Sequence, residues 1–198
     1  MSIIVSKSGH DAQILKSSGF KTEDYLQEYI QNNPNTIPIY EISDDKRLFV
    51  AKREFSTNSG PIDALAIDKD GDIYVIETKL YKNPDKRAVV AQALDYGAAL
   101  WKHLTDFSNF IEILNDECSK KFDMFFQEKV MDFFGIEQDR FEIMLEAIRQ
   151  NLNEGKIKFV ILMDSMDERL KDLIIYVNQN SQFDIYAVQF ECYNFEEY

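Results

Sequence analysis

The sequence lacks several features that mark common classes of protein. No apolar run approaches the roughly 20 residues that a membrane-spanning helix needs, and the longest, Phe159–Met163, has the size of a strand. The N-terminal residues do not have the layout of a signal peptide. The two cysteines form neither a disulfide framework nor a zinc pattern, and the two histidines lie far apart in the sequence. We therefore expect a cytoplasmic protein that does not bind membranes.

The chain also lacks the excess of basic residues that is typical of nucleic-acid binders. Its net charge is −13, whereas contacts to phosphates need lysine and arginine. The charge is uneven, with −4 over residues 1–45, +2 over residues 46–103 and −11 over residues 104–198. Three explanations of the acidic C-terminal half stay open: it faces away from any nucleic acid, it binds a basic protein partner, or a DNA-binding part lies elsewhere.

What is present is the composition of a folded protein with its own core. The chain has 198 residues, of which 45% are hydrophobic and 29% are charged. The predicted order of elements indicates an α/β fold with a mixed central sheet flanked by helices. We interpret residues 1–198 as a single domain in which residues 105–152 form a helical insertion. The predicted elements are a helix from Thr22 to about Asn33, an extended segment at Ile37–Ile42, strands at Leu48–Phe55, Ile62–Ile67 and Ile73–Leu80, a helix from Asn83 to about Leu104, helices within residues 106–150, a strand at Lys156–Met163, a helix at Asp167–Gln179 and a strand at Phe183–Tyr193.

The strand at Ile73–Leu80 carries charge where burial is expected. Both of its faces are largely apolar, which is typical of a central strand. Because side chains alternate between faces, Glu77 and Lys79 share one face. Leaving either charge unpaired in a buried sheet would cost several kcal/mol. We therefore expect that the two side chains pair with each other or that a metal ion compensates the carboxylate.

A third charge, Asp63, lies on the preceding strand, and its position relative to Glu77 depends on the hairpin register. A two-residue loop places Ala64 opposite Glu77. A three-residue loop with Gly71 in the left-handed conformation pairs Asp68 with Asp72 and therefore places Asp63 opposite Glu77. Two carboxylates about 5 Å apart repel each other unless a cation joins them, and a hard divalent ion with oxygen ligands suits that role.

The following helix presents a glutamine and a tyrosine on one face. Gln92 and Tyr96 are four residues apart, so their side chains are neighbours on the helix surface. An amide and a phenol can each contact a phosphate or a base edge.

Together these residues resemble the PD-(D/E)xK nuclease superfamily, with its restriction-endonuclease-like fold, and most closely its NucS-like and RecB-like branches. The resemblance covers residues 22–103 and rests on Gly60–Asp63, on Glu77–Lys79, and on Gln92 and Tyr96. It implies a Mg²⁺-dependent (or Mn²⁺-dependent) deoxyribonuclease in repair, restriction or defence, which leaves a 5′-phosphate.

The resemblance also implies roles for individual residues. Asp63, Glu77, the carbonyl of Thr78 and, directly or through water, Glu28 would hold the metal. Lys79 would orient the attacking water and stabilise charge on the phosphate. The residues that would position or bind the substrate are Gln92, Tyr96, Lys82 and Arg87, with Lys52, Arg53 and Lys86 as further cations of a phosphate-binding rim.

Less specific interpretations stay open beside these roles. Asp63, Glu77 and Lys79 would also suit a structural ion pair, Glu28 a solvated helix position, and Gln92 and Tyr96 ordinary helix packing. The alternative function is a catalytically silent nuclease-like fold that acts as a protein- or nucleic-acid-interaction module. Cleavage of RNA is a further option, as is a homodimer.

Overall fold

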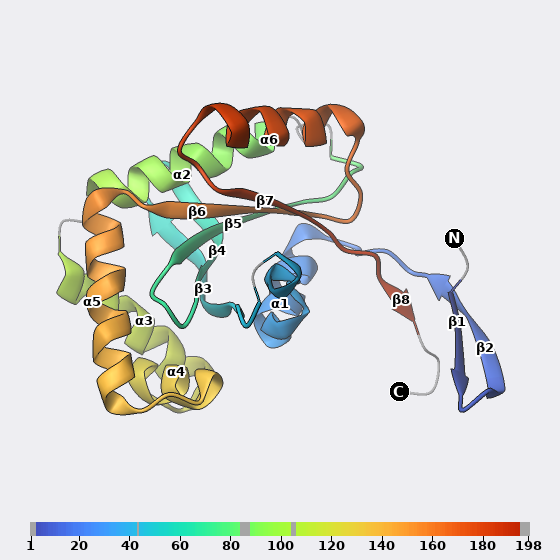
Figure 1. Cartoon of the computed structure of the whole chain (residues 1–198), viewed down its shortest axis with the longest axis horizontal. Coiled ribbons are helices and arrows are strands. Elements are labelled where there is room, and N and C mark those ends of the chain that lie inside the picture. Colours follow the sequence, from blue (N-terminus) through green and yellow to red (C-terminus); the bar gives the residue numbers. More distant parts are fainter. Residues whose placement is uncertain (1–2, 43, 84–87, 104–105, 195–198) are drawn as a thin grey trace.

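A five-stranded mixed sheet forms the centre of the molecule (Figure 1). The computed structural model describes residues 3–42, 44–83, 88–103 and 106–194. The strand order is β3-β4-β5-β6-β7, in which the first two pairings are antiparallel and the last two are parallel. The predicted mixed α/β fold is therefore confirmed. The strands of this sheet are β3 (Phe49–Thr57), β4 (Gly60–Ile67), β5 (Ile73–Lys79), β6 (Ile157–Met163) and β7 (Ile185–Gln189).

Helices cover both faces of the sheet, and each face has its own apolar core. Helices α2 to α6 lie on one face, whereas α1 and two short 3₁₀ helices lie on the other. None of the described helices combines the length and apolarity needed to cross a membrane. The helices are α1 (Glu23–Asn32), η1 (Pro34–Thr36), η2 (Ile39–Glu41), α2 (Val89–His103), α3 (Phe107–Phe122), α4 (Phe126–Phe134), α5 (Gln138–Glu154) and α6 (Glu168–Asn180).

The β4–β5 hairpin has the register of the three-residue loop. The Asp68 amide donates to the Asp72 carbonyl oxygen at 3.1 Å, and Gly71 has a left-handed φ of 83°. Glycine is required there for a second reason, because a Cβ atom would lie 2.6 Å from the Met144 carbonyl oxygen of α5. Continued along the strands, this register places Asp63 opposite Glu77, as predicted.

Strands β4 and β5 separate before they reach that pair. Their ladder ends at the pair Ala64–Ile76. Beyond it, Gly60–Ile62 pair with β3 alone, and Glu77–Lys79 pair with β6 alone. The charged residues predicted for the site therefore lie where the two central strands diverge.

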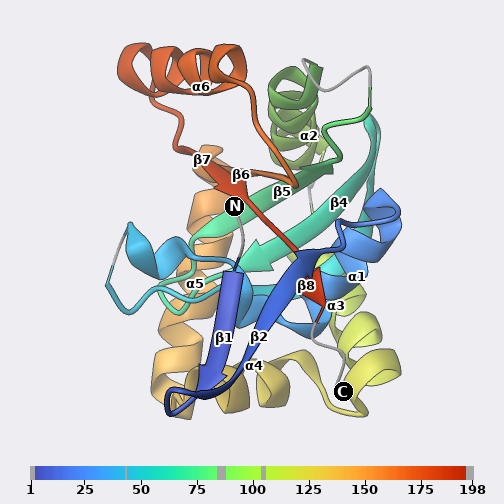
Figure 2. The same ribbon diagram turned by 90° about the vertical axis from the view of Figure 1, so that its right-hand side faces the viewer.

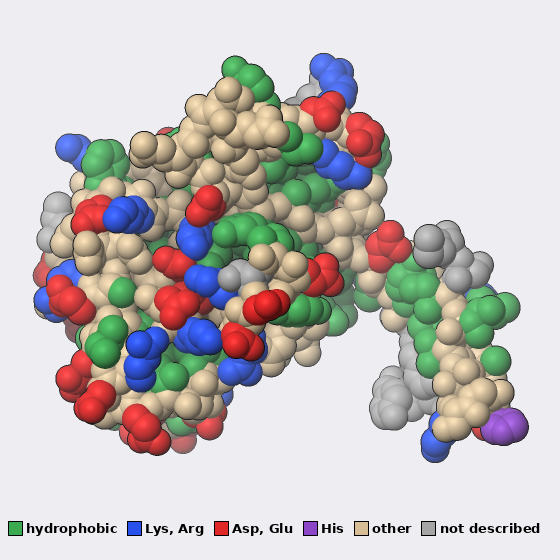
Figure 3. All heavy atoms as spheres, in the orientation of Figure 1, with side chains coloured by type: hydrophobic (Ala, Val, Ile, Leu, Met, Phe, Trp, Pro, Cys, Tyr) green, Lys and Arg blue, Asp and Glu red, His purple; other side chains and the backbone are tan. Residues whose placement is uncertain are grey.

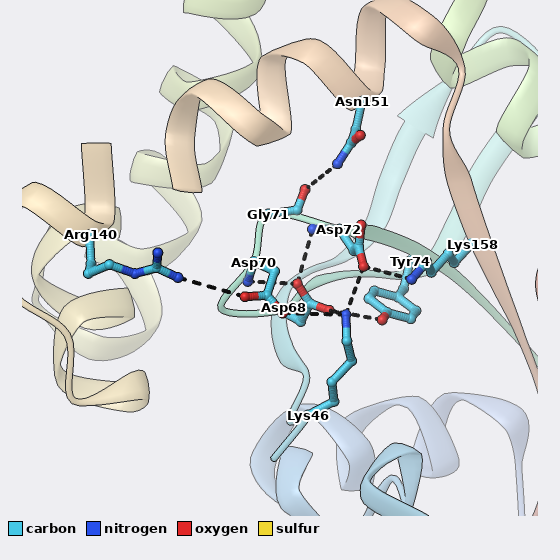
Figure 4. A network of polar contacts seen from close by, with 9 residues as sticks. All are labelled: Lys46, Asp68, Asp70, Gly71, Asp72, Tyr74, Arg140, Asn151 and Lys158. Atoms are coloured by element: carbon cyan, nitrogen blue, oxygen red, sulfur yellow. Dashed lines mark hydrogen bonds and ion pairs between the residues drawn. The ribbon is translucent and has the colours of Figure 1, made fainter. Parts of the chain in front are cut away.

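A polar network at the opposite end of the same hairpin ties it to the helices that follow α2 (Figure 4). The Lys46 ammonium lies 2.6 Å from Asp68 and 2.8 Å from Asp72, and Asp68 is fully buried. From α5, Asn151 donates to the Gly71 carbonyl oxygen at 3.0 Å. This network fixes the hairpin turn against α5.

A separate small sheet projects from the body as an arm (Figures 1 and 2). It consists of β1 (Ile3–Lys7), β2 (His10–Ser17) and β8 (Tyr193–Asn194), in the order β1-β2-β8. No described side chain of β1 or β2 is buried, and apolar side chains lie open on the arm, including the cross-strand pair Ile4 and Ile14 (Figure 3).

Two local predictions differ from the structure, and one hairpin was not predicted. Ile37–Ile42 contains the 3₁₀ helix η2 rather than an extended segment. The predicted strand Phe183–Tyr193 is divided between β7 and β8, which belong to different sheets. The hairpin of the arm was not predicted, because its side chains have no buried face that would impose a pattern. The helix predicted from Asn83 is described as α2 from Val89; Asn83 itself is not helical, and residues 84–87 lie outside the described residues.

Candidate active site

Glu77 is a fully buried carboxylate without a hydrogen-bond partner. It lies on the α2 side of β5, and its exposed fraction is 0%. Neither Oε1 nor Oε2 accepts a hydrogen bond from any described residue. An orphaned carboxylate of this kind costs stability unless it is protonated or bound by a cation.

Asp63 lies beside Glu77 and is held through Thr78. The Thr78 backbone amide and the Thr78 hydroxyl both donate to Asp63 Oδ2, each at 2.7 Å. The Asp63 side chain therefore accepts the hydrogen bond of the Thr78 amide at the point where the β4 backbone no longer pairs with β5. Its second oxygen, Oδ1, has no donor among the described residues.

Lys79 provides the positive charge of the cluster. Its ammonium lies 3.9 Å from Glu77 Oε1 and 3.8 Å from Glu23 Oε2. Both separations exceed hydrogen-bond length, so Lys79 balances part of the negative charge without saturating either carboxylate.

The electrostatics of the cluster favour proton or cation binding at Glu77. The pKa of Glu77 is raised to about 9, first by burial and then by the negative charge of Asp63, while the positive charge of Lys79 opposes the rise. Burial also raises the pKa of Asp63, while the two hydrogen bonds from Thr78 lower it. Glu54, which has a left-handed φ of 49°, adds negative charge near both carboxylates.

Gln92 and Tyr96 of α2 meet at the edge of this cluster. Gln92 Nε2 donates to the Tyr96 hydroxyl at 2.9 Å, which leaves the hydroxyl proton available for another acceptor. Tyr96 also lies against Gly60 of β4, where a Cβ atom would be 3.5 Å from the hydroxyl oxygen. The negative charges of Glu77 and Asp63 both act on Tyr96, which places it within range of the pair.

The helix α1 contributes a different carboxylate from the one predicted. Glu28 is exposed on α1, and its charge acts on Lys121. Glu23 instead accepts hydrogen bonds from the Leu80 amide and from Asn83 Nδ2, both at 3.1 Å, and reaches Lys79. The two glutamates lie about 140° apart around the helix, so only one of them can face the end of β5.

Two residues of this region were missed in the sequence: Glu23 and the buried Gln27. They share one face of α1 with Gln31, at intervals of four residues, beside the apolar positions Leu26 and Ile30. The sequence signal that could have identified these two residues was a row of polar side chains next to a buried apolar row on the same helix.

The cations of the predicted phosphate rim are largely occupied. Lys52 pairs with Glu117 at 2.9 Å, and Arg53 pairs with Asp24 at 2.5 Å. Lys82 donates to the Lys21 carbonyl oxygen at 3.0 Å. The predicted cations Lys86 and Arg87 lie outside the described residues.

The donor set fits a small hard cation. Within the described parts of the chain, no group of three or more His, Cys, Asp or Glu side chains is spaced to hold a metal ion by itself. Mg²⁺, however, is commonly held by one or two carboxylates, with water and substrate oxygens completing its octahedron. Asp63 and the orphaned Glu77 supply such a pair.

Comparisons with known proteins add little to this geometry. No protein-family model and no curated protein matches the sequence. Among solved structures, the chain is similar to the crystal structure of a repair endonuclease from Pyrococcus abyssi, with 12% identity and a TM-score of 0.35. The match covers 95% of this chain and 65% of that one, so this chain spans about two thirds of its length.

Proposed function

We propose that this protein is a metal-dependent nuclease that hydrolyses phosphodiester bonds of DNA, with Mg²⁺ or Mn²⁺ as cofactor. One observation carries the proposal: Glu77 is fully buried, neither of its oxygens accepts a hydrogen bond from a described residue, and Asp63 and Lys79 lie next to it. A purely structural ion pair would be expected to close the distance between Glu77 and Lys79, whereas 3.9 Å leaves the carboxylate free for a ligand.

Each residue of the cluster has a defined part in this proposal. Asp63 and Glu77 hold the ion, with the Thr78 carbonyl as a further ligand from β5. When bound, the ion polarises a phosphoryl oxygen and lowers the pKa of water. The Lys79 ammonium stabilises negative charge on the phosphate. Tyr96, which accepts from Gln92, can donate its own proton to a substrate oxygen.

Glu23 takes the place that the family resemblance gave to Glu28. The Leu80 amide and Asn83 hold one oxygen of Glu23, and the other faces Lys79. We infer that Glu23 orients Lys79 and that Glu28 has no part in the site. Glu23→Gln and Glu28→Gln form a matched pair on one helix, and only the first is expected to lower activity.

A cleavage assay tests the proposed function. The wild type is incubated with Mg²⁺ or Mn²⁺ and labelled single-stranded, duplex and flap DNA, and EDTA provides the metal-free control. We expect cleavage that EDTA abolishes and that falls at least 100-fold in Asp63→Ala, Glu77→Ala and Lys79→Ala. Cleavage that persists in all three variants would contradict the assignment of the site.

A second candidate function is a silent nuclease-like fold that binds a partner. It is favoured by the occupied cations, because Lys52 and Arg53 are neutralised by Glu117 and Asp24 rather than free for phosphates. The acidic C-terminal half would then suit a basic protein partner, or a homodimer would complete the surface. Metal-independent binding of a basic protein, unchanged in Glu77→Ala, would favour this alternative.

A further inference from the structure

A buried glutamine connects α1 to the Asp63 side of the site. Gln27 is 5% exposed, and its Nε2 donates to the Thr78 hydroxyl oxygen at 3.4 Å. Thr78, in turn, donates to Asp63. A primary amide that is buried between a helix and a central strand requires partners at both its ends, since a buried amide without hydrogen bonds destabilises the fold.

Arg53 fixes the orientation of this amide. Arg53 Nη2 donates to Gln27 Oε1 at 3.3 Å, and an arginine can only donate. The oxygen end of the amide must therefore face Arg53, and the NH₂ end must face Thr78. Arg53 is itself held by Asp24, whose carboxylate and backbone carbonyl oxygens both accept from Nη2, at 2.5 and 3.3 Å.

The orientation of Gln27 in turn fixes the hydroxyl proton of Thr78. A threonine hydroxyl has one proton and two lone pairs. Since Gln27 offers a donor, the hydroxyl accepts on that side and its single proton is directed to Asp63 Oδ2, 2.7 Å away. Arg53 therefore donates to Gln27, Gln27 donates to Thr78, and Thr78 donates to Asp63, so that each donor of this chain lies on the Arg53 side of its acceptor.

We propose that Gln27 is a positioning residue, which, through this directed chain from Arg53 to Thr78, holds the Asp63 carboxylate so that its Oδ1 is presented to the metal. The proposal rests on the proposed function, because it needs a metal at Asp63. Two donors fixed on Oδ2 restrict the side chain and leave Oδ1 as the free ligand atom. Residues that orient a metal ligand in this way typically change metal affinity 10–100-fold when they are replaced.

Gln27→Glu is the sharpest test, because it reverses one hydrogen bond without changing the shape of the side chain. An ionised carboxylate has no donor, so the Thr78 hydroxyl would turn its proton towards position 27 and away from Asp63. By Coulomb's law alone, an added negative charge near a cation site would raise affinity for Mn²⁺. The proposal instead predicts about a 10-fold loss of affinity.

Two further variants isolate the effect. Thr78→Val removes the hydroxyl while nearly preserving the shape, and we expect it to lose about as much Mn²⁺ affinity as Gln27→Glu. In the double variant Gln27→Glu with Thr78→Val, the two losses of Mn²⁺ affinity should not add, because the valine has no hydroxyl proton that a carboxylate at position 27 could redirect. Gln27→Met removes the donor but leaves Thr78 free to donate to Asp63, so its loss should be smaller.

Calorimetric titration of Mn²⁺ into these variants separates the outcomes. Unchanged affinity in Gln27→Glu, or additive losses in the double variant, would overturn the role of Gln27. If the wild type has no Mn²⁺ site that Glu77→Gln removes, the proposed function fails instead.

The directed chain is then judged in the metal-free protein by the NMR signal of the Thr78 amide proton. This signal should move downfield in Gln27→Glu, as Asp63 Oδ2 loses its second donor, and not in Gln27→Met. An unchanged signal in both would contradict the directed chain.

Discussion

At the scale of single residues, the site is defined by the Glu77 carboxylate, which accepts no hydrogen bond from any described residue. Lys46 shows how the same molecule treats buried acids that have a structural role. Its ammonium contacts Asp68 and Asp72 at 2.6 and 2.8 Å, and Asp68 also accepts from the Tyr74 hydroxyl at 3.0 Å. Glu77 has no such contacts. This difference supports a ligand role for Glu77 and a structural role for Asp68.

Glu77→Gln is expected to stabilise the metal-free protein at alkaline pH. The pKa of Glu77 is raised by burial from 4.5 to about 9, so the folded state retains a proton that the unfolded state releases. The contribution of this group to stability is therefore complete below about pH 4.5 and is lost as the pH rises to about 9. At pH 8 we expect the variant to be more stable than the wild type by about 1–3 kcal/mol, with a difference that closes towards pH 5. Urea unfolding in EDTA across this pH range measures it.

Glu28→Gln is the matched control for this prediction. Its carboxylate is exposed on α1 and does not lie in the cluster, so the variant should follow the wild type at every pH. A destabilised Glu77→Gln variant at pH 8 would indicate instead that Glu77 is a structural partner of Lys79.

Lys46→Met is expected to destabilise the fold by about 3–5 kcal/mol, because it leaves the fully buried Asp68 without its cation. Urea unfolding at neutral pH measures the change. Lys171→Met is a suitable comparison, since Lys171 forms an exposed pair with Glu168 on α6 and its loss should cost less than about 1 kcal/mol. Equal losses in the two variants would show that the Lys46 network does not stabilise the hairpin.

At the scale of elements, local signals determined most of what could be predicted. The turn containing Gly71 predicted two possible registers for Asp63 and Glu77, one for each loop length, and the structure has the register of the three-residue loop. The cap at Thr22 was also local, and its hydroxyl accepts from the Tyr25 amide at 3.1 Å. These predictions needed no knowledge of tertiary packing.

Contacts between distant elements were not predictable in the same way. Whether Glu23 or Glu28 faces the site depends on how α1 crosses the sheet, and no short-range pattern specifies that angle. The divergence of β4 and β5 beyond the pair Ala64–Ile76 is likewise non-local, because there β4 pairs with β3 and β5 pairs with β6. The roles of Glu23 and Gln27 therefore emerged only from the structure.

Strands β1 and β2 of the arm bury no described side chain, and β2 pairs with β8. Because none of their described side chains is buried, deletion of residues 1–17 should change the free energy of unfolding by less than about 1 kcal/mol. Thermal unfolding at several protein concentrations measures this. A loss of several kcal/mol that depends on concentration would show that the arm is buried in an assembly such as a homodimer.

At the scale of the whole molecule, the net charge of −13 conflicts with DNA binding unless the contact area is small. Basic and acidic side chains are mixed on the face shown in Figure 3. With few phosphate contacts, DNA binding should depend weakly on salt, with a slope in log–log form no steeper than about −3. Fluorescence anisotropy of labelled DNA with Glu77→Ala at increasing salt measures the slope, and a much steeper one would show a basic surface beyond the site.

Calorimetric titration of Mg²⁺ and Mn²⁺ into the wild type and Glu77→Gln, at low salt, tests the central claim most directly. The proposed site predicts one saturable binding event per chain, accompanied by proton release near neutral pH, that disappears in the variant. The absence of binding in the wild type, or equal binding in both proteins, would contradict a metal site at Asp63 and Glu77.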